Sequence, residues 1–256
     1  MNQATIATLI DRFDYSGAYC LCCDKAEDSA LLHLLDIARS MVNFDFVTAQ
    51  SILTVKGDFF PLSFAAYLEQ NLLDLIYGEP NAIFSEHLAN MYFQMEREEY
   101  IDLLGRLYRF SEAFLKYVFI KEHQKVLSVY DSAFEEGRAL RILKKRYRIY
   151  NRNIIFAVVE YIHKHSDNPA LKSCADFITD PKMKALADLR NASIVGHGFE
   201  AVSYSDVLTA YGEPINLLRD LEAIMQRGGL EIDRKKYSKI NAFLIKELDY
   251  VNWKQK

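Results

Sequence analysis

Residues 100–123 read YIDLLGRLYRFSEAFLKYVFIKEH, and this stretch decides the fold class. Its apolar side chains recur every three or four residues, at Ile101, Leu104, Leu107, Tyr108, Leu115 and Val118. An α-helix turns once in about 3.6 residues, so this spacing predicts one apolar helix face. From Asn81 to His123 there is no proline and only Gly105 interrupts, so we predict two helices with a break near residues 96–99.

The same spacing extends through most of the chain. The sequence holds only 10 Gly and 5 Pro, which disfavours a strand-rich fold with many tight turns. The segment from Ile154 to Ile162 is rich in β-branched residues, but its apolar positions recur at helical intervals. Asp180-Pro181 predicts a helix start, and we expect that helix to end near Val195 with Gly196 in a left-handed conformation. We therefore expect an all-α protein.

The charge distribution suggests two domains. Residues 1–100 contain 5 Lys+Arg and 15 Asp+Glu, whereas residues 101–256 contain 26 and 20. The balance changes close to residues 78–98, and a helix predicted to start near Pro61 is expected to end near Pro80. We predict a helical N-terminal domain over residues 1–95 and a helical-bundle domain over residues 96–256. Any polyanion is expected to bind the second half.

Composition also limits the cellular setting and the chemistry. No apolar run approaches the roughly 20 residues that span a bilayer, and the N-terminus lacks the pattern of a signal peptide. Cys20, Cys22, Cys23 and Cys174 form neither a disulfide framework nor a zinc-ligand spacing, so buried free thiols are the simpler interpretation. We expect a cytoplasmic protein without membrane association, metal or cofactor.

One stretch carries candidate chemistry: residues 189–198, LRNASIVGHG. On a continuous helix Arg190 and His197 would share one face, about 10 Å apart along the axis, and a turn at Gly196 would bring them closer. Histidine moves protons near neutral pH, and arginine binds phosphate oxygens with its planar fork. Such a pair suits RNA cleavage, in which the ribose 2′-hydroxyl attacks the adjacent phosphate, but a solvated helix face also shows such pairs.

Arg190-Asn191, followed by His197 after six intervening residues, resembles the Arg–His motif of the HEPN superfamily. Residues 100–113, YIDLLGRLYRFSEA, are similar to the opening helix of the HEPN domain in ancillary ribonucleases of type III CRISPR systems. The resemblance implies metal-independent endonucleolytic cleavage of single-stranded RNA in CRISPR-linked antiviral defence. It implies that Arg190 binds the phosphate, that Asn191 orients Arg190 or His197 by a hydrogen bond, and that His197 transfers protons. It also implies a homodimer.

The chain departs from that family in one respect. Those ribonucleases carry an N-terminal sensor domain for cyclic oligoadenylate, with a parallel sheet, before a helical middle domain and the HEPN domain. Residues 1–95 show no alternation of strands and helices. The resemblance therefore covers the middle and HEPN domains, and cyclic oligoadenylate sensing is not expected of this chain.

A second candidate feature is a basic segment, residues 138–152, predicted as one helix. Five cations fall on one face at intervals of three and four residues: Arg138, Arg141, Lys145, Arg148 and Arg152. This face is expected to bind the phosphates of RNA. The alternative is an ordinary amphipathic surface helix whose long side chains cover core atoms.

Two other functions remain open at the level of sequence. The chain can be a non-catalytic helical module that binds RNA or protein, which would keep the basic face and dispense with the Arg–His pair. It can also be a HEPN toxin that a partner holds inactive.

Overall fold

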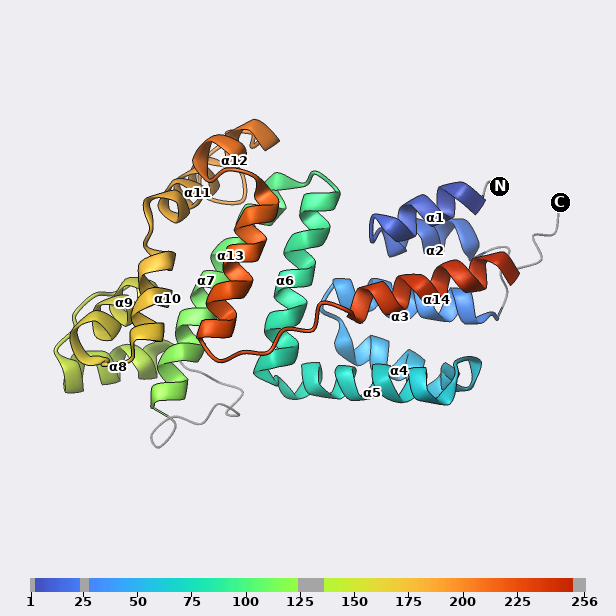
Figure 1. Ribbon diagram of the computed structural model, residues 1–256, viewed down its shortest axis with the longest axis horizontal. Helices are drawn as coiled ribbons and strands as arrows, with labels where there is room; N and C mark the ends of the chain where they lie inside the picture. The colour runs from blue at the N-terminus through green and yellow to red at the C-terminus, as the bar shows by residue number, and fades with distance from the viewer. Residues whose placement is uncertain (1–2, 24–27, 124–135, 251–256) are drawn as a thin grey trace. The chain divides into compact units, whose positions relative to one another are not determined.

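The computed structural model describes residues 3–23, 28–123 and 136–250, the last range with side chains from residue 139 onward. These ranges contain fourteen α-helices, one short 3-10 helix and no β-strand, which confirms the all-α prediction (Figure 1). Two compact units divide the chain: residues 1–89 with 233–256, and residues 90–232.

The first unit is built around α3. Its elements are α1 (Gln3–Asp11), α2 (Tyr15–Cys22), α3 (Ala30–Val42), α4 (Phe46–Lys56), η1 (Gly57–Phe59), α5 (Leu62–Tyr77), the start of α6 (Pro80–Glu96) and α14 (Lys236–Tyr250). Helices α2, α4 and α14 all pack on α3, whose buried face includes Leu31, Leu34 and Leu35. The first turns of α2, α3 and α4 are each capped by a side chain, from Asp14, Ser29 and Asp45 respectively.

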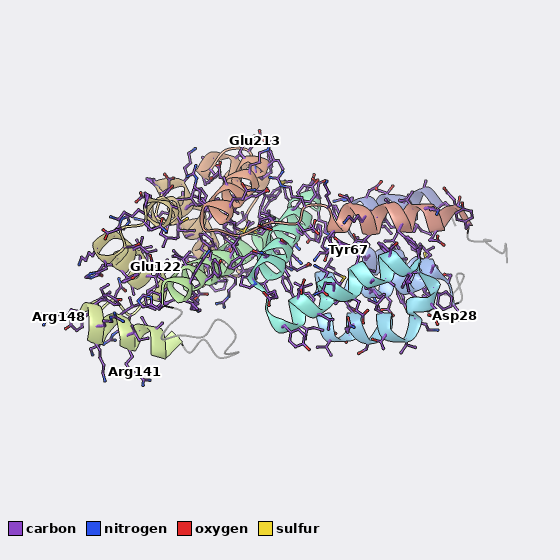
Figure 2. The ribbon with its side chains drawn as sticks, turned by 60° about the horizontal axis from the view of Figure 1, so that its bottom comes forward. Asp28, Tyr67, Glu122, Arg141, Arg148 and Glu213 are labelled. Atoms are coloured by element: carbon purple, nitrogen blue, oxygen red, sulfur yellow. The ribbon has the colours of Figure 1, made fainter. Side chains whose placement is uncertain are left out.

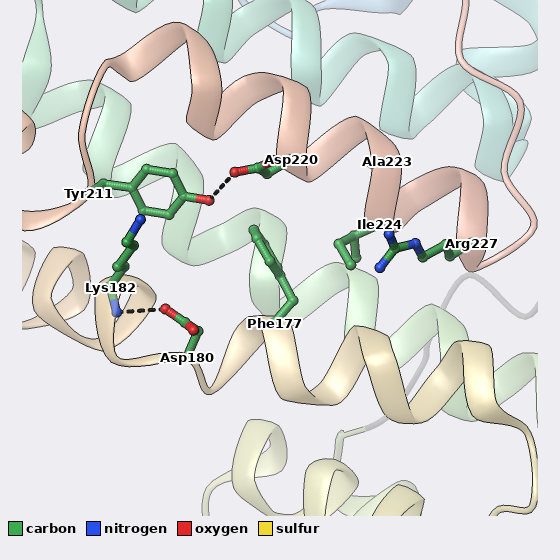
Figure 3. Close-up of a pocket in the computed structure, with 8 residues that line it drawn as sticks. All are labelled: Phe177, Asp180, Lys182, Tyr211, Asp220, Ala223, Ile224 and Arg227. Carbon is green, nitrogen blue, oxygen red and sulfur yellow. Dashed lines mark hydrogen bonds between the residues drawn. The ribbon is translucent and has the colours of Figure 1, made fainter.

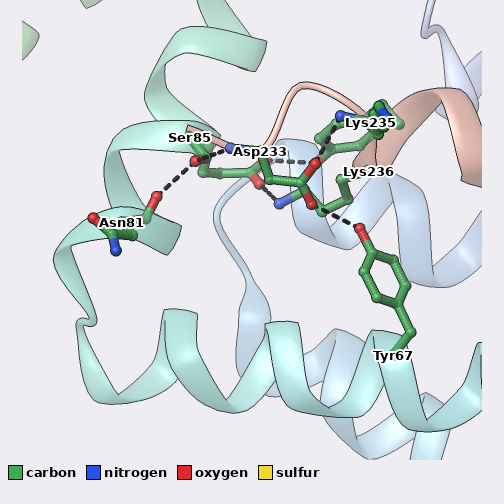
Figure 4. A network of polar contacts seen from close by, with 8 residues as sticks. Tyr67, Asn81, Ser85, Asp233, Lys235 and Lys236 are labelled. Atoms are coloured by element: carbon green, nitrogen blue, oxygen red, sulfur yellow. Dashed lines mark hydrogen bonds and ion pairs between the residues drawn. The ribbon is translucent and has the colours of Figure 1, made fainter. Parts of the chain in front are cut away.

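Helix α14 belongs to this unit, whereas the sequence assigned residues 96–256 to one domain. A buried network holds its start (Figure 4). Lys236, 2% exposed, pairs with the fully buried Glu86 of α6, which also accepts a hydrogen bond from the Tyr237 hydroxyl. The Asp233 amide donates to the Ser85 hydroxyl, and the Tyr67 hydroxyl donates to the Asp233 carboxylate. These contacts are distant in sequence, so no local pattern could reveal them.

The second unit is built around α7 (Tyr100–Glu122), on which α9 (Ile154–His165), α10 (Pro169–Ile178) and α11 (Pro181–Ala192) pack. The remaining helices are the end of α6, α8 (Glu136–Tyr147), α12 (Tyr204–Ala210) and α13 (Pro214–Arg227). The buried face of α7 includes Leu103, Leu107, Phe110 and Phe114. Burying each such side chain contributes roughly 1.5–3 kcal/mol relative to leaving it exposed.

Several predicted boundaries are confirmed. Helix α6 ends at Glu96 and α7 begins at Tyr100, which is the predicted break. The β-branched segment is the helix α9. The Asp180 carboxylate caps α11 by accepting a hydrogen bond from the Lys182 amide, and Pro181 opens the helix.

Two predicted boundaries are wrong. Helix α11 ends at Ala192 and not at Val195, and Gly196 does not have a positive φ. The basic segment is not one helix over residues 138–152, because α8 ends at Tyr147 and Arg148 takes a left-handed conformation with φ 58°. Glu98 closes α6 with a similar φ of 63°.

Candidate functional site

Helix α11 positions the candidate catalytic arginine. Its buried residues are Met183 and Leu186, and the helix packs on α7 and α12. Arg190 lies in its last turn, two residues before the end of the helix. The packing of α11 on α7 therefore brings Arg190 close to a helix that lies far from it in sequence.

The end of α11 is closed by a turn that folds back over it. The last four carbonyl groups of a helix have no partner within the helix. Here Ser193 N donates to the carbonyls of Leu189 and Arg190, His197 N donates to that of Asn191, and Glu200 N donates to that of Ala192. The turn, residues 193–200, therefore satisfies all four orphan carbonyls, and its backbone path is fixed by the helix end.

Two glycines allow this close approach. A Cβ atom on Gly196 would lie 2.3 Å from the Arg190 carbonyl oxygen, and one on Gly198 would lie 1.9 Å from the Ala192 carbonyl oxygen. Both distances are far below a van der Waals contact and involve backbone atoms, which cannot rotate away. Glycine is required at both positions because the backbone passes directly over the helix end.

The turn sets where His197 lies. The sequence placed Arg190 and His197 on one face of a continuous helix, and the structure corrects this, because His197 is in the turn. Its amide bonds to the Asn191 carbonyl at 3.1 Å, so its backbone lies beside the last turn of α11. The imidazole is exposed. The turn, which bends at Gly196, therefore brings the backbones of Asn191 and His197 together.

The Arg190 side chain is held without a carboxylate. Its guanidinium carbon lies 4.5 Å from the ring centroid of Tyr108 on α7, a cation–π contact. Its Nη1 donates to the Asn191 Oδ1 at 3.0 Å. Its Nε is buried and has no hydrogen-bond partner among the described residues. The guanidinium is thereby oriented by a ring and a neutral amide, which leave its charge uncompensated.

Sequence reasoning missed Tyr108 as part of this site. The helical spacing assigned it to the apolar stripe of α7, and nothing in the sequence links that helix to Arg190. The one available signal was an aromatic residue on the stripe, which has a polar end and a face that suits a cation.

Two exposed apolar side chains lie within the turn. Ile194 is 71% exposed and Phe199 is 95% exposed. Exposed apolar side chains mark binding surfaces where they gather.

The basic segment forms a second candidate feature. Arg141 and Lys145 are exposed on α8, and Arg148 and Arg152 are exposed in the irregular link 148–153 that follows. Figure 2 labels Arg141 and Arg148. The side chain of Arg138 lies outside the described residues. The predicted single helical stripe is therefore divided between a helix and a link, although its four described cations remain at the surface.

The end of α8 is anchored on α7 and α9 through Tyr147. The hydroxyl of Tyr147 bonds to His123 Nε2 at 2.9 Å, and the His123 Nδ1 bonds to the Phe119 carbonyl at 2.8 Å. The Tyr147 ring packs edge-on against Tyr161 of α9. Desolvation, and then the hydrogen bond to Glu122, raises the pKa of Tyr161, so this phenol stays protonated at neutral pH.

One open pocket lies elsewhere in the second unit, between α10, the start of α11, and α13 (Figure 3). Its volume is about 300 Å³. Its polar side chains already have partners: Tyr211 donates to Asp220 at 2.7 Å, Arg227 donates to Ser173, and Lys182 lies over the Tyr211 ring. It contains none of the predicted site residues.

Metal-ligating side chains and thiols are a further set of reactive groups. No cluster of three or more His, Cys, Asp or Glu side chains occurs within residues 3–23, 28–123 and 136–250. Burial raises the pKa of the Cys22 and Cys174 thiols to about 11, so both are protonated at neutral pH. Among the helices described, none combines the length and apolar character needed to cross a bilayer.

Neither the models of known protein families nor the sequences of curated proteins match this chain.

Proposed function

We propose that this chain is a metal-independent endoribonuclease that cleaves single-stranded RNA, with Arg190, Asn191 and His197 as its catalytic group. CRISPR-linked antiviral defence is the setting that the resemblance to HEPN ribonucleases suggests. The proposal rests on the sequence motif and on the arrangement of these side chains at the end of α11.

The incomplete hydrogen bonding of the Arg190 side chain is the observation that carries the proposal. Its buried Nε lacks a hydrogen-bond partner among the described residues, and its Nη1 bonds to a neutral amide. A buried donor without a partner is costly. A guanidinium fixed over a tyrosine ring with donors uncommitted is a suitable binding group for a phosphate anion, whose oxygens would complete those hydrogen bonds.

The chemistry follows from the residue types. A base removes the proton of the ribose 2′-hydroxyl, whose oxygen then attacks phosphorus. The bond from phosphorus to the 5′-oxygen breaks, and an acid gives that oxygen a proton. His197 performs one of these proton transfers and Arg190 stabilises the charge on the phosphate oxygens. Asn191 holds the guanidinium in place through its amide oxygen.

In-line cleavage needs a base and an acid on opposite sides of phosphorus, and one histidine cannot occupy both places. We therefore propose a homodimer in which two turns, residues 193–200, face one cleft. The exposed Ile194 and Phe199 beside His197 favour this arrangement, because a second copy would cover them. Light scattering of the wild type and of the variant Phe199→Ser tests it: the wild type should be dimeric and the variant weakened or monomeric.

The activity is tested with paired variants on a fluorescent RNA and on its 2′-deoxy analogue. His197→Ala should slow cleavage on the order of 10²–10⁴-fold, which is the usual contribution of an acid–base group to the rate. Arg190→Lys keeps the charge but loses the fork and should retain only part of the rate. His163→Ala removes an exposed histidine of α9 and is the matched control. Equal rates for His197→Ala and His163→Ala would remove His197 from the mechanism.

A non-catalytic RNA-binding module is the second candidate. The cations of α8 and the link 148–153 favour it, because they form a basic surface that does not need the Arg190–His197 pair. This candidate predicts RNA binding without cleavage, and unchanged binding in Arg190→Ala.

A further inference from the structure

The surface around the end of α8 combines cations with exposed aromatic side chains. No acidic residue occurs between Gly137 and Val159, a segment that holds seven cations: Arg138, Arg141, Lys144, Lys145, Arg146, Arg148 and Arg152. Of these, the six with described side chains make no ion pair with any described acidic group. Elsewhere in this unit, Arg109 pairs with Glu112 and Lys164 pairs with Glu160.

Two aromatic residues of this segment are exposed. Tyr150 is 68% exposed in the link after α8. Phe156, in the first turn of α9, is 54% exposed. Exposing a large aromatic ring forgoes the free energy that its burial would provide.

The backbone of the link explains why Tyr150 points outward. Ile149 is 2% exposed, and its amide donates to the Leu143 carbonyl at 3.1 Å, which ties the link to α8. With Ile149 directed inward, its neighbours Arg148 and Tyr150 are both at the surface. The link therefore displays a cation and an aromatic ring on either side of one buried anchor.

One cation, Lys144, lies close enough to Tyr150 to act with it. The Lys144 ammonium is 6.0 Å from the Tyr150 ring centroid. A ring beside an ammonium group offers a flat face for a base and a charge for the adjoining phosphate. Proteins that bind single strands use this combination, because every base has a flat face and every nucleotide has a phosphate.

We infer that Tyr150 and Phe156, set among Lys144, Arg148 and Arg152, form a stacking surface for unpaired bases of a single-stranded nucleic acid. This inference deepens the proposed function by naming how the basic surface selects single strands. It does not depend on cleavage, because the surface contains none of the residues of the Arg190 site.

The cations and the aromatic rings should make separate contributions to binding. The cations neutralise phosphates and should determine the salt dependence of affinity. The rings contact bases and should determine the preference for unpaired nucleotides over duplex or bare polyanion. A surface that binds phosphate alone would bind all three in proportion to their charge.

The test measures binding in the His197→Ala background, so that cleavage does not interfere. The probes are an oligouridine of about 12 nucleotides, within the usual range of site sizes, an abasic strand of equal length, and a duplex of equal length. We expect the oligouridine to bind most tightly of the three probes. Tyr150→Ala with Phe156→Ala should weaken oligouridine binding by roughly tenfold or more, since stacking is worth about 1–3 kcal/mol per base. Its salt dependence should not change.

Matched controls complete the experiment. Tyr77→Ala removes a tyrosine of the first unit that is 71% exposed and should leave affinity unchanged. Arg148→Gln with Arg152→Gln should weaken all three probes and flatten the salt dependence. Equal affinity for the oligouridine and the abasic strand would overturn the inference, as would a double aromatic variant that binds like the wild type, or no binding of any probe.

These results remain distinct from those on the proposed function. If the wild type fails to cleave RNA but the aromatic variants lose oligouridine binding, the stacking surface stands and the ribonuclease proposal fails. If cleavage is confirmed and the aromatic variants bind normally, the reverse holds. Capture of a protein partner by this surface, with no preference for the oligouridine, would also contradict the inference.

Discussion

The variant Gly198→Ala should open the turn, residues 193–200, that carries His197. The added Cβ would lie 1.9 Å from the Ala192 carbonyl oxygen and 2.4 Å from its carbonyl carbon, so the backbone must move. Three backbone hydrogen bonds of the turn are then at risk, with Gly198, His197 and Glu200 as donors. At roughly 0.5–1.5 kcal/mol each, their loss should lower the free energy of unfolding by about 2–4 kcal/mol.

Urea unfolding followed by far-ultraviolet circular dichroism measures this change, and an RNA cleavage assay measures its effect on activity. Gly105→Ala is the matched control, because a Cβ there meets only Val195 of the same turn, at an ordinary 3.9 Å. An alanine within α7 should stabilise the helix by about 0.5–1 kcal/mol. The account is refuted if Gly198→Ala unfolds at the wild-type urea concentration and cleaves RNA at the wild-type rate.

Three further predictions concern stability and reactivity. Glu86→Ala should lower the free energy of unfolding, measured in urea, by about 3–5 kcal/mol, because Lys236 would keep a buried charge without a partner. The double variant Glu86→Leu with Lys236→Met should recover most of that loss. Equal losses in the two variants would contradict this. Arg148→Gly and Glu98→Gly relieve the same left-handed backbone strain, so each should raise the free energy of unfolding, by at most about 1 kcal/mol. Only Arg148→Gly should weaken RNA binding in a filter assay. Cys174, with its pKa raised by burial to about 11, should resist a thiol reagent at pH 8 until urea unfolds the chain, whereas the exposed Cys20 should react at once. Fast labelling of Cys174 itself in the folded protein, located by peptide mass spectrometry, would disprove its burial.

Local signals in the sequence predicted the parts of the fold that local interactions determine. The break between α6 and α7 and the Asp180-Pro181 start of α11 follow from caps and spacing within a few residues. The end of α11 was not predicted, because the turn after it replaces the next helical hydrogen bonds with contacts from His197 and Glu200.

Contacts between distant residues account for the rest. Helix α14 joins the first unit through the pair between Lys236 and Glu86, which are separated by 150 residues. Tyr108 meets Arg190 only because α7 and α11 pack together. The predicted site residues Arg190 and Asn191 do contact each other, and no spacing rule could add the ring beneath them.

The most direct test of the central claim is the chemistry of the cleaved ends. Purified protein is incubated with single-stranded RNA in excess EDTA, and the products are examined by mass spectrometry. The account predicts continued cleavage, with 2′,3′-cyclic phosphate or its hydrolysis product on one fragment and a 5′-hydroxyl on the other, and no such products from His197→Ala. Cleavage that stops in EDTA and returns with magnesium or manganese, or that leaves 5′-phosphate ends, would contradict it.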